Sequence, residues 1–194
     1  GAVLLAVAGI NPGVAYGKLL NGVFGQVKYV TWSVVYAAPL ILTGLSVAFS
    51  FRTGVFNIGA EGQFVVGSIA ACVVGIVFHL PAPLHIFLCI VAAVAAGALW
   101  GVIVGFLKVK RGINEVLSYI MFNWIAFYLS NYIVNLKAIR RVGGGEASQD
   151  VADTARILAP EFVKTATRCT AANWGIVIAV AAAILVWFII SKTT

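Results

Sequence analysis

The sequence predicts an all-α integral membrane protein, a polytopic bundle with about six transmembrane helices. Two observations predict this fold class. Of the 194 residues, 62% are hydrophobic and only 10% are charged, and the mean hydropathy is +1.04; a soluble domain carries about 25% charged residues. In addition, apolar runs of about 20 residues recur along the chain, and each is long enough to cross about 30 Å of hydrocarbon.

The apolar runs and the residues that interrupt them define the expected elements. The first run, 1–10, is about half a span, and we interpret it as a cut first helix followed by a polar turn over 11–29. Full spans are expected at 31–51, 64–78, 84–107, 114–136 and 174–190. We therefore expect a single transmembrane domain over 1–194, incomplete at both ends, with an external polar loop over 137–172.

Two of the connections carry residues that stop a helix. HLPAPLH over 79–85 has two prolines, which prevent a continuous helix. The long polar loop contains GGGEASQDVADTARILAPEF, in which Ser148 is a candidate cap of a short helix. This loop is either a docking surface for an external partner or a flexible, solvated connector.

Basic residues between the spans predict the orientation. The net charge is +7, but because Lys and Arg lie in connections, we attribute them to orientation and to anionic membrane lipid, and expect no nucleic acid. The short basic loop KVKRG over 108–112 is expected in the cytoplasm, with Arg52 and Lys192 on the same side. The long loop is expected outside, since long loops translocate with less regard to their charge.

The sequence lacks the patterns of an enzyme or of a metal site. Cys72, Cys89 and Cys169 show no CxxC or other ligand spacing, so they are expected to be small apolar residues. There is no P-loop, HExxH or Ser-His-Asp set, and His79 and His85 bracket a turn at the membrane interface. We therefore expect no catalytic residue, metal or cofactor in this chain.

One short stretch, VFNIGAEGQF over 55–64, places polar groups between apolar runs. Asn57, Glu61 and Gln63 alternate with glycines, which weaken a helix. Irregular backbone at membrane depth is tolerated only against protein or water, and unwound segments recur in transporter binding sites. The alternative is a turn at the membrane surface with Glu61 solvated.

Two expected spans carry polar stripes. On the fifth, one set of residues between Glu115 and Ser130 lies within about 80° of Glu115, and this set includes Tyr119, Phe122 and Asn123. Trp124 points the opposite way. On the second, Tyr36, Pro39, Thr43, Ser46 and Ser50 share one face; these side chains either line a cavity or bond back to their own helix. We predict a substrate pathway formed by Asn57, Glu61, Gln63, Glu115, Tyr119, Phe122, Asn123, Tyr36, Thr43 and Ser46.

Small residues recur every four positions on the fourth span, at Gly97, Gly101 and Gly105. In lipid, helices associate through close backbone contact, which small residues permit. We therefore assign these three glycines to helix packing.

Two segments resemble a known family. RTGVFNIGAEGQ over 52–63 is similar to a signature of the permease subunits of bacterial and archaeal ABC importers for nucleosides and simple sugars. KVKRGINEVLSYIMFNWIA over 108–126 is similar to that family's basic loop and following helix. The form NIGAEG resembles the nucleoside branch, whereas the ribose branch tends to an Ile-Asp-Leu-Ser type sequence there.

The resemblance implies a multi-pass permease subunit of the cell membrane that translocates nucleosides or related simple sugars by alternating access. It implies a second permease subunit, two cytoplasmic ATP-binding subunits that use ATP and Mg, and an external substrate-binding protein. The alternative is an ATP-independent channel or secondary carrier for small polar solutes. Such a carrier would need ion or proton sites, for which Glu61 and Glu115 are the acidic residues close to a span.

Overall fold

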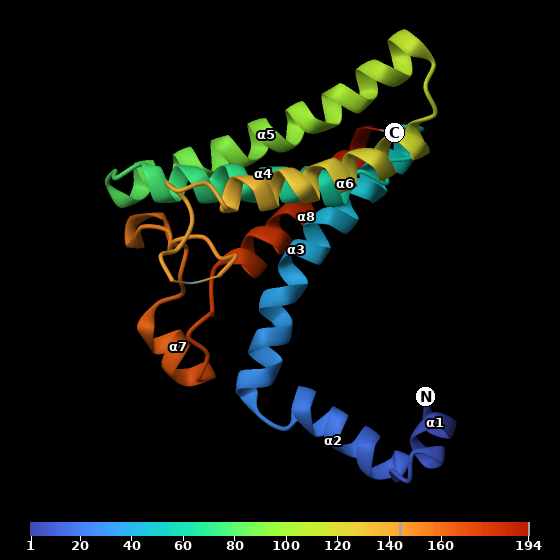
Figure 1. Ribbon diagram of the computed structural model, residues 1–194, viewed down its shortest axis with the longest axis vertical. Helices are drawn as coiled ribbons and strands as arrows, with labels where there is room; N and C mark the ends of the chain where they lie inside the picture. The colour runs from blue at the N-terminus through green and yellow to red at the C-terminus, as the bar shows by residue number, and fades with distance from the viewer. Residues whose placement is uncertain (144, 194) are drawn as a thin grey trace. The chain divides into compact units, whose positions relative to one another are not determined.

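The computed structural model describes residues 1–143 and 145–193, and its regular structure is helical (Figure 1). The elements are α1 (Ala2–Val7), α2 (Pro12–Phe24), α3 (Val27–Arg52), α4 (Ala60–Val77), α5 (Ala82–Arg111), α6 (Glu115–Val134), the 3-10 helix η1 (Asp153–Ala155), α7 (Glu161–Thr167) and α8 (Gly175–Thr193). The chain divides into two compact units, one of residues 1–41 and 158–184 and one of residues 42–157 and 185–194. Both α3 and α8 contribute to each unit.

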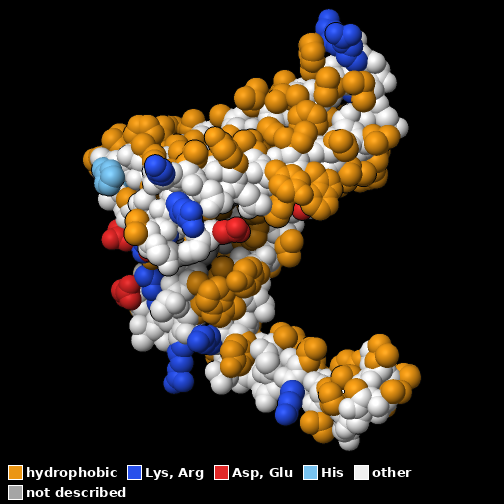
Figure 2. Space-filling view, in the orientation of Figure 1, with side chains coloured by type: hydrophobic (Ala, Val, Ile, Leu, Met, Phe, Trp, Pro, Cys, Tyr) orange, Lys and Arg blue, Asp and Glu red, His pale blue; other side chains and the backbone are white. Residues whose placement is uncertain are grey.

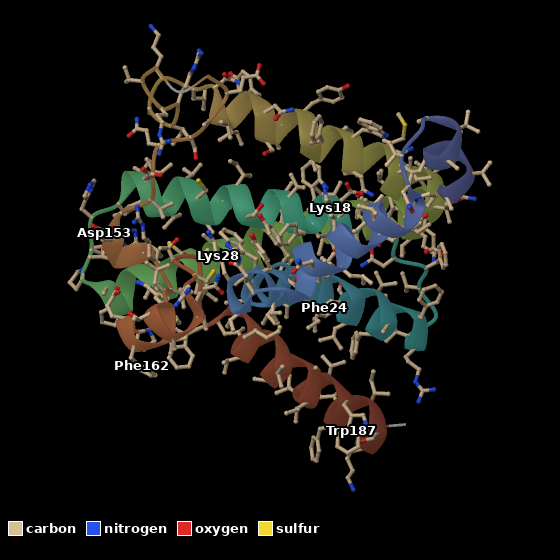
Figure 3. The ribbon with its side chains drawn as sticks, turned by 90° about the horizontal axis from the view of Figure 1, so that it is seen from below. Lys18, Phe24, Lys28, Asp153, Phe162 and Trp187 are labelled. Carbon is tan, nitrogen blue, oxygen red and sulfur yellow. The ribbon has the colours of Figure 1, made fainter. Side chains whose placement is uncertain are left out.

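Four helices of the described residues, α3, α4, α5 and α8, are long and apolar enough to cross a membrane. Two of the six expected spans are therefore not among them. At six residues α1 is too short, and the 20 residues of α6 include polar side chains such as Asn123 and Asn131. Figure 2 shows apolar side chains spread over the outside of α5 and basic residues at its far end. In Figure 3, Trp187 of α8, which is 68% exposed, points away from its helix, as expected for a lipid-facing or partner-facing ring.

The expected polar turn over 11–29 is wrong, because α2 occupies most of it. The Asn11 side chain accepts a hydrogen bond from the Gly13 N–H at 2.9 Å, and Pro12 takes the first helical position. An Asn cap followed by Pro is a favourable helix start, since proline has no N–H to leave unpaired there.

The break between α3 and α4 spans residues 53–59, so the stretch VFNIGAEGQF is divided. Its first half is irregular and its second half forms the first turns of α4, which begins at Ala60 and not at 64. Gly54 adopts a φ of 77°, a left-handed conformation that favours glycine. The irregular backbone expected from the glycines is therefore present, and it is confined to the connection that precedes α4.

α4 packs against both α5 and α6 in the second unit (Figure 1). Small residues allow this approach. A Cβ added to Gly67 would lie 3.0 Å from the Ala93 carbonyl oxygen, and one added to Gly97 would lie 3.2 Å from that of Gln63. A Cβ on Gly101 would overlap the Gln63 side-chain amide, whereas Gly105 has nothing within 4 Å. The three glycines assigned to packing thus differ in their surroundings.

Gly101→Leu is expected to lower the amount of assembled complex, because the added side chain must displace Gln63 from the face of α5. Overpacking of this kind costs about 1–3 kcal/mol. The matched control is Gly105→Leu, one helical turn further along α5, where an added Cβ has nothing within 4 Å. Assembly can be followed by size-exclusion chromatography of the solubilised complex. An equal loss in the two variants would contradict the packing role of Gly101.

Residues 152–154 of the long loop are hydrogen-bonded to the α4–α5 hairpin. His85 is 0% exposed, and its ring nitrogens lie 2.8 Å from the Thr154 hydroxyl and 3.3 Å from the Val74 carbonyl oxygen. The Ala152 N–H also donates to the Gly75 carbonyl at 2.9 Å. His85 is therefore buried between the hairpin and the loop. The helix expected after Ser148 is wrong: this residue forms an isolated bridge with Arg140, and η1 begins at Asp153.

Candidate functional site

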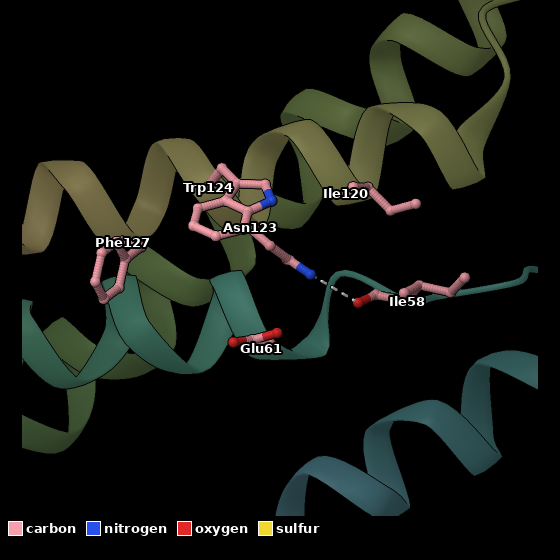
Figure 4. Close-up of a pocket in the computed structure, with 6 residues that line it drawn as sticks. All are labelled: Ile58, Glu61, Ile120, Asn123, Trp124 and Phe127. Atoms are coloured by element: carbon pink, nitrogen blue, oxygen red, sulfur yellow. Dashed lines mark hydrogen bonds between the residues drawn. The ribbon is translucent and has the colours of Figure 1, made fainter.

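The candidate site is a cavity of about 460 Å³ in the second unit, between the start of α4 and one side of α6. We call it the α4–α6 cavity. Figure 4 shows Glu61 on the first turn of α4, with the lining side chains of α6 on the other side. The cavity is lined by Ile58, Glu61, Ile120, Asn123, Trp124 and Phe127.

Asn123 joins α6 to the break that precedes α4. Its side-chain oxygen accepts a hydrogen bond from the Gly62 N–H at 2.9 Å, and its side-chain amide donates to the Ile58 carbonyl at 3.2 Å (Figure 4). The first N–H groups of a helix have no partner within the helix. Here one of them is capped by a residue that lies 61 positions away in the sequence. Asn123 therefore acts as a clamp on the backbone around the cavity.

Asn57 and Gln63 form a second polar connection across the same break. Asn57 is buried, and its side-chain oxygen accepts from the Gly59 N–H at 2.9 Å. Its amide lies 3.4 Å from the Gln63 side-chain oxygen, to which it donates. Gln63 in turn lies against Gly101 of α5. These two amides thus connect the break to α4 and, through Gln63, to α5.

The aromatic side chains of the predicted pathway are packed against other residues. Tyr119 is 6% exposed, and its ring lies directly over Gly59. Phe122 contacts Trp100 of α5 edge to face, with 5.4 Å between ring centroids. The Trp100 indole N–H is buried without a hydrogen-bond partner in the described part of the chain, next to Gly62.

Glu115 lies at the first residue of α6, where its carboxylate forms an ion pair with Lys108 from the last turn of α5. Glu115 therefore connects the ends of α5 and α6, and it does not line the α4–α6 cavity.

The polar stripe of α3 contributes no side chain to the lining of the α4–α6 cavity. Tyr36 belongs to the first unit and stacks on Trp32 with 5.6 Å between ring centroids. Thr43 and Ser46 belong to the second unit, but neither lines the α4–α6 cavity. The Ser46 carbonyl accepts a hydrogen bond from the Ser50 hydroxyl at 2.9 Å, which is the back-bonding pattern common in helices.

Glu61 differs from the other polar residues of the site. It is exposed in the first turn of α4, and within residues 1–143 and 145–193 no hydrogen bond or ion pair reaches its carboxylate. An ionised carboxylate only accepts hydrogen bonds, on two oxygens. The cavity thus offers a solute one carboxylate, beside aromatic and aliphatic side chains.

Helical geometry explains which α6 residues the sequence pattern missed. The centre of the polar stripe is buried, at Ser118, Tyr119 and Ala126, so the stripe marks the side on which α6 packs. The cavity lies at the edge of the stripe, about 80–180° from Glu115 at 100° per residue. Trp124, expected on the opposite side, lines the cavity together with Ile120 and Phe127. Their spacing of three and four residues is the available signal.

A multi-pass helical protein with a clamped break before a spanning helix, and a partly polar cavity beside that break, has the features of a membrane permease. The sequence family agrees: the chain belongs to the family described as branched-chain amino acid transport system, permease component, which matches residues 29–194.

Curated relatives match the full length of this chain. It is 41% identical to the guanosine ABC transporter permease protein NupP of Bacillus subtilis and 30% identical to the glucose ABC transporter permease protein TsgB13 of Haloferax volcanii. It is 27% identical to the nucleoside ABC transporter permease protein NupB of Lactococcus lactis. The chain covers 55%, 52% and 54% of these proteins, and so spans about half of their length. No solved structure matches it.

Proposed function

We propose that this chain is a transmembrane permease subunit of an ATP-binding-cassette importer that translocates nucleosides across the cell membrane by alternating access. The observation that carries the proposal is the α4–α6 cavity, in which the Glu61 carboxylate faces the rings of Trp124 and Phe127. A nucleoside offers both a flat π-surface and hydrogen-bond donors to such a cavity. The whole-length similarity to a guanosine permease supports the same substrate class.

The cavity lining argues against the substrate in the family description. A branched-chain amino acid is a zwitterion, and its carboxylate needs a cationic or donor-rich partner once it leaves water. None of the six lining side chains carries a positive charge, and the remaining donors, the second N–H of the Asn123 amide and the Trp124 indole N–H, are neutral. A neutral nucleoside requires no such cation. A sugar shares the hydroxyl donors but adds no flat aromatic face for the two rings.

The proposal includes partner subunits. A second permease subunit, cytoplasmic ATPase subunits that bind ATP and Mg, and an external binding protein would complete the importer. Support comes from similarity to two Bacillus subtilis guanosine permeases, NupP over the full chain and NupQ over 54% of it. This chain would then supply the pathway, and the ATPase subunits would supply the energy.

The test is transport by the complete importer in proteoliposomes loaded with ATP. We expect ATP-dependent uptake of labelled guanosine that vanadate abolishes, with leucine and glucose at background. The matched control is an importer whose ATPase subunits bind but do not hydrolyse ATP. Guanosine uptake without ATP would favour the channel or secondary carrier, and leucine uptake would favour the family description.

The orientation can be tested by cysteine labelling in intact cells, in a variant without Cys72, Cys89 and Cys169. We expect Glu146→Cys in the long loop to react with an impermeant maleimide from outside, and Lys110→Cys to remain unreacted until the cells are opened. Glu146 is exposed, whereas Ser148 is half-buried. The reverse labelling pattern would invert the topology.

A further inference from the structure

We propose that the Glu61 carboxylate selects the substrate by accepting two adjacent N–H groups from the edge of a guanine-type base. The flat face of the base would lie on the ring of Trp124, with the ring of Phe127, whose plane is at 85° to that of Trp124, beside it. This inference rests on the proposed function and deepens it, because it names the chemical group that the α4–α6 cavity recognises.

The carboxylate is the charged group of the cavity, and its oxygens remain available to a ligand. Asn123 uses its oxygen for the Gly62 N–H and one N–H of its amide for the Ile58 carbonyl. Glu61 lies across the cavity from the α6 rings (Figure 4), and no described group bonds to its carboxylate. A ligand donor that meets a carboxylate forms a charge-assisted hydrogen bond, which is about twice as strong as a neutral one.

The opposite wall suits a flat ring. Trp124 is 59% exposed and Phe127 is 49% exposed, so both rings offer apolar area to a ligand. They lie on α6, whereas Glu61 lies on α4. A base stacked on the Trp124 ring with its edge turned toward α4 would present that edge to the carboxylate. The volume of about 460 Å³ falls in the range of small-molecule sites, which is about 300–1,000 Å³.

The pattern of donors on the base decides the selectivity. The edge of guanine carries N1–H and the N2 amino group side by side, which matches the two carboxylate oxygens. Hypoxanthine, the base of inosine, keeps only N1–H. Adenine presents a lone pair at N1, which would face the negative oxygens. A ribose diol also has two adjacent donors, so it shares the hydrogen-bonding chemistry, but it lacks the flat face that the α6 rings would cover.

The experiment is competition against labelled guanosine bound to the complete transmembrane complex, purified with its ATPase subunits and without the external binding protein. Omitting that protein places the selection at the permease. We expect guanosine and 2′,3′-dideoxyguanosine to compete about tenfold or more better than inosine and adenosine, the effect of one charge-assisted hydrogen bond. In Glu61→Gln, the affinity for guanosine should fall to that for inosine, because one of the two hydrogen-bond acceptors becomes a donor.

The control variant is Glu146→Gln, which removes the same charge from the exposed loop outside the cavity and should keep the guanosine preference. As a second variant, Trp124→Leu removes a largely exposed ring. It should lower the affinities for guanosine and dideoxyguanosine alike, by about tenfold. An unchanged preference in Glu61→Gln would overturn the inference. So would failure of dideoxyguanosine to compete while adenosine does, since the carboxylate would then bind the ribose.

This outcome is distinguishable from failure of the proposed function. Suppose that the importer takes up guanosine with ATP, but Glu61→Gln leaves the preference for guanosine over inosine and adenosine unchanged. The proposed function is then retained, and only the proposal of base selection by Glu61 is lost. An importer that neither binds nor takes up any nucleoside loses both.

Discussion

Asn123→Ala is expected to destabilise the assembled importer strongly, and to abolish uptake for that reason. The substitution leaves the Gly62 N–H and the Ile58 carbonyl without their partner, and both lie where α4 begins. Gly62 is buried, and a buried backbone group that loses its hydrogen bond costs about 1–3 kcal/mol. The measurement is the thermal unfolding midpoint of the solubilised complex, which should fall together with transport.

The matched control is Asn131→Ala, the same change two turns further along α6, where the residue is exposed. Surface substitutions of this kind usually change the free energy of unfolding by no more than about 0.5 kcal/mol. If Asn123→Ala were as stable as the parent complex but bound guanosine more weakly, Asn123 would be a substrate ligand and not a clamp.

Gly59→Ala is expected to be the second most damaging change. Its new methyl group would overlap the ring of Tyr119, which is buried and cannot move into solvent. Overpacking costs about 1–3 kcal/mol and occasionally more. Gly105→Ala, which meets nothing within 4 Å, is the control and should leave the unfolding midpoint nearly unchanged.

A double-mutant cycle identifies the cause of the Gly59 effect. In Gly59→Ala with Tyr119→Ala, the methyl group no longer meets a ring, so the double variant should be less destabilised than the sum of the two single variants. Residues in contact typically show coupling of about 0.5–3 kcal/mol. Strict additivity would mean that the cost of Gly59→Ala does not come from the approach of Tyr119.

The helical class and most helix positions could be predicted from sequence. Mean hydropathy and run length are local properties, and they located α3, α4, α5 and α8 to within a few residues. The helix α2, where a polar turn is expected, also has a local signal, because Asn followed by Pro is a favourable helix start. The docking of the loop through His85 had none, because its partners Thr154 and Val74 lie on other elements.

The sequence by itself determined that polar residues gather at the break before α4 and on one side of α6, because composition and helical period are properties of the chain alone. Only the tertiary structure decided which of these residues bond to the protein and which face a cavity. A break leaves particular N–H and carbonyl groups unpaired, and the packing of α4 on α6 brings Asn123 to them while it leaves Glu61 without a described partner.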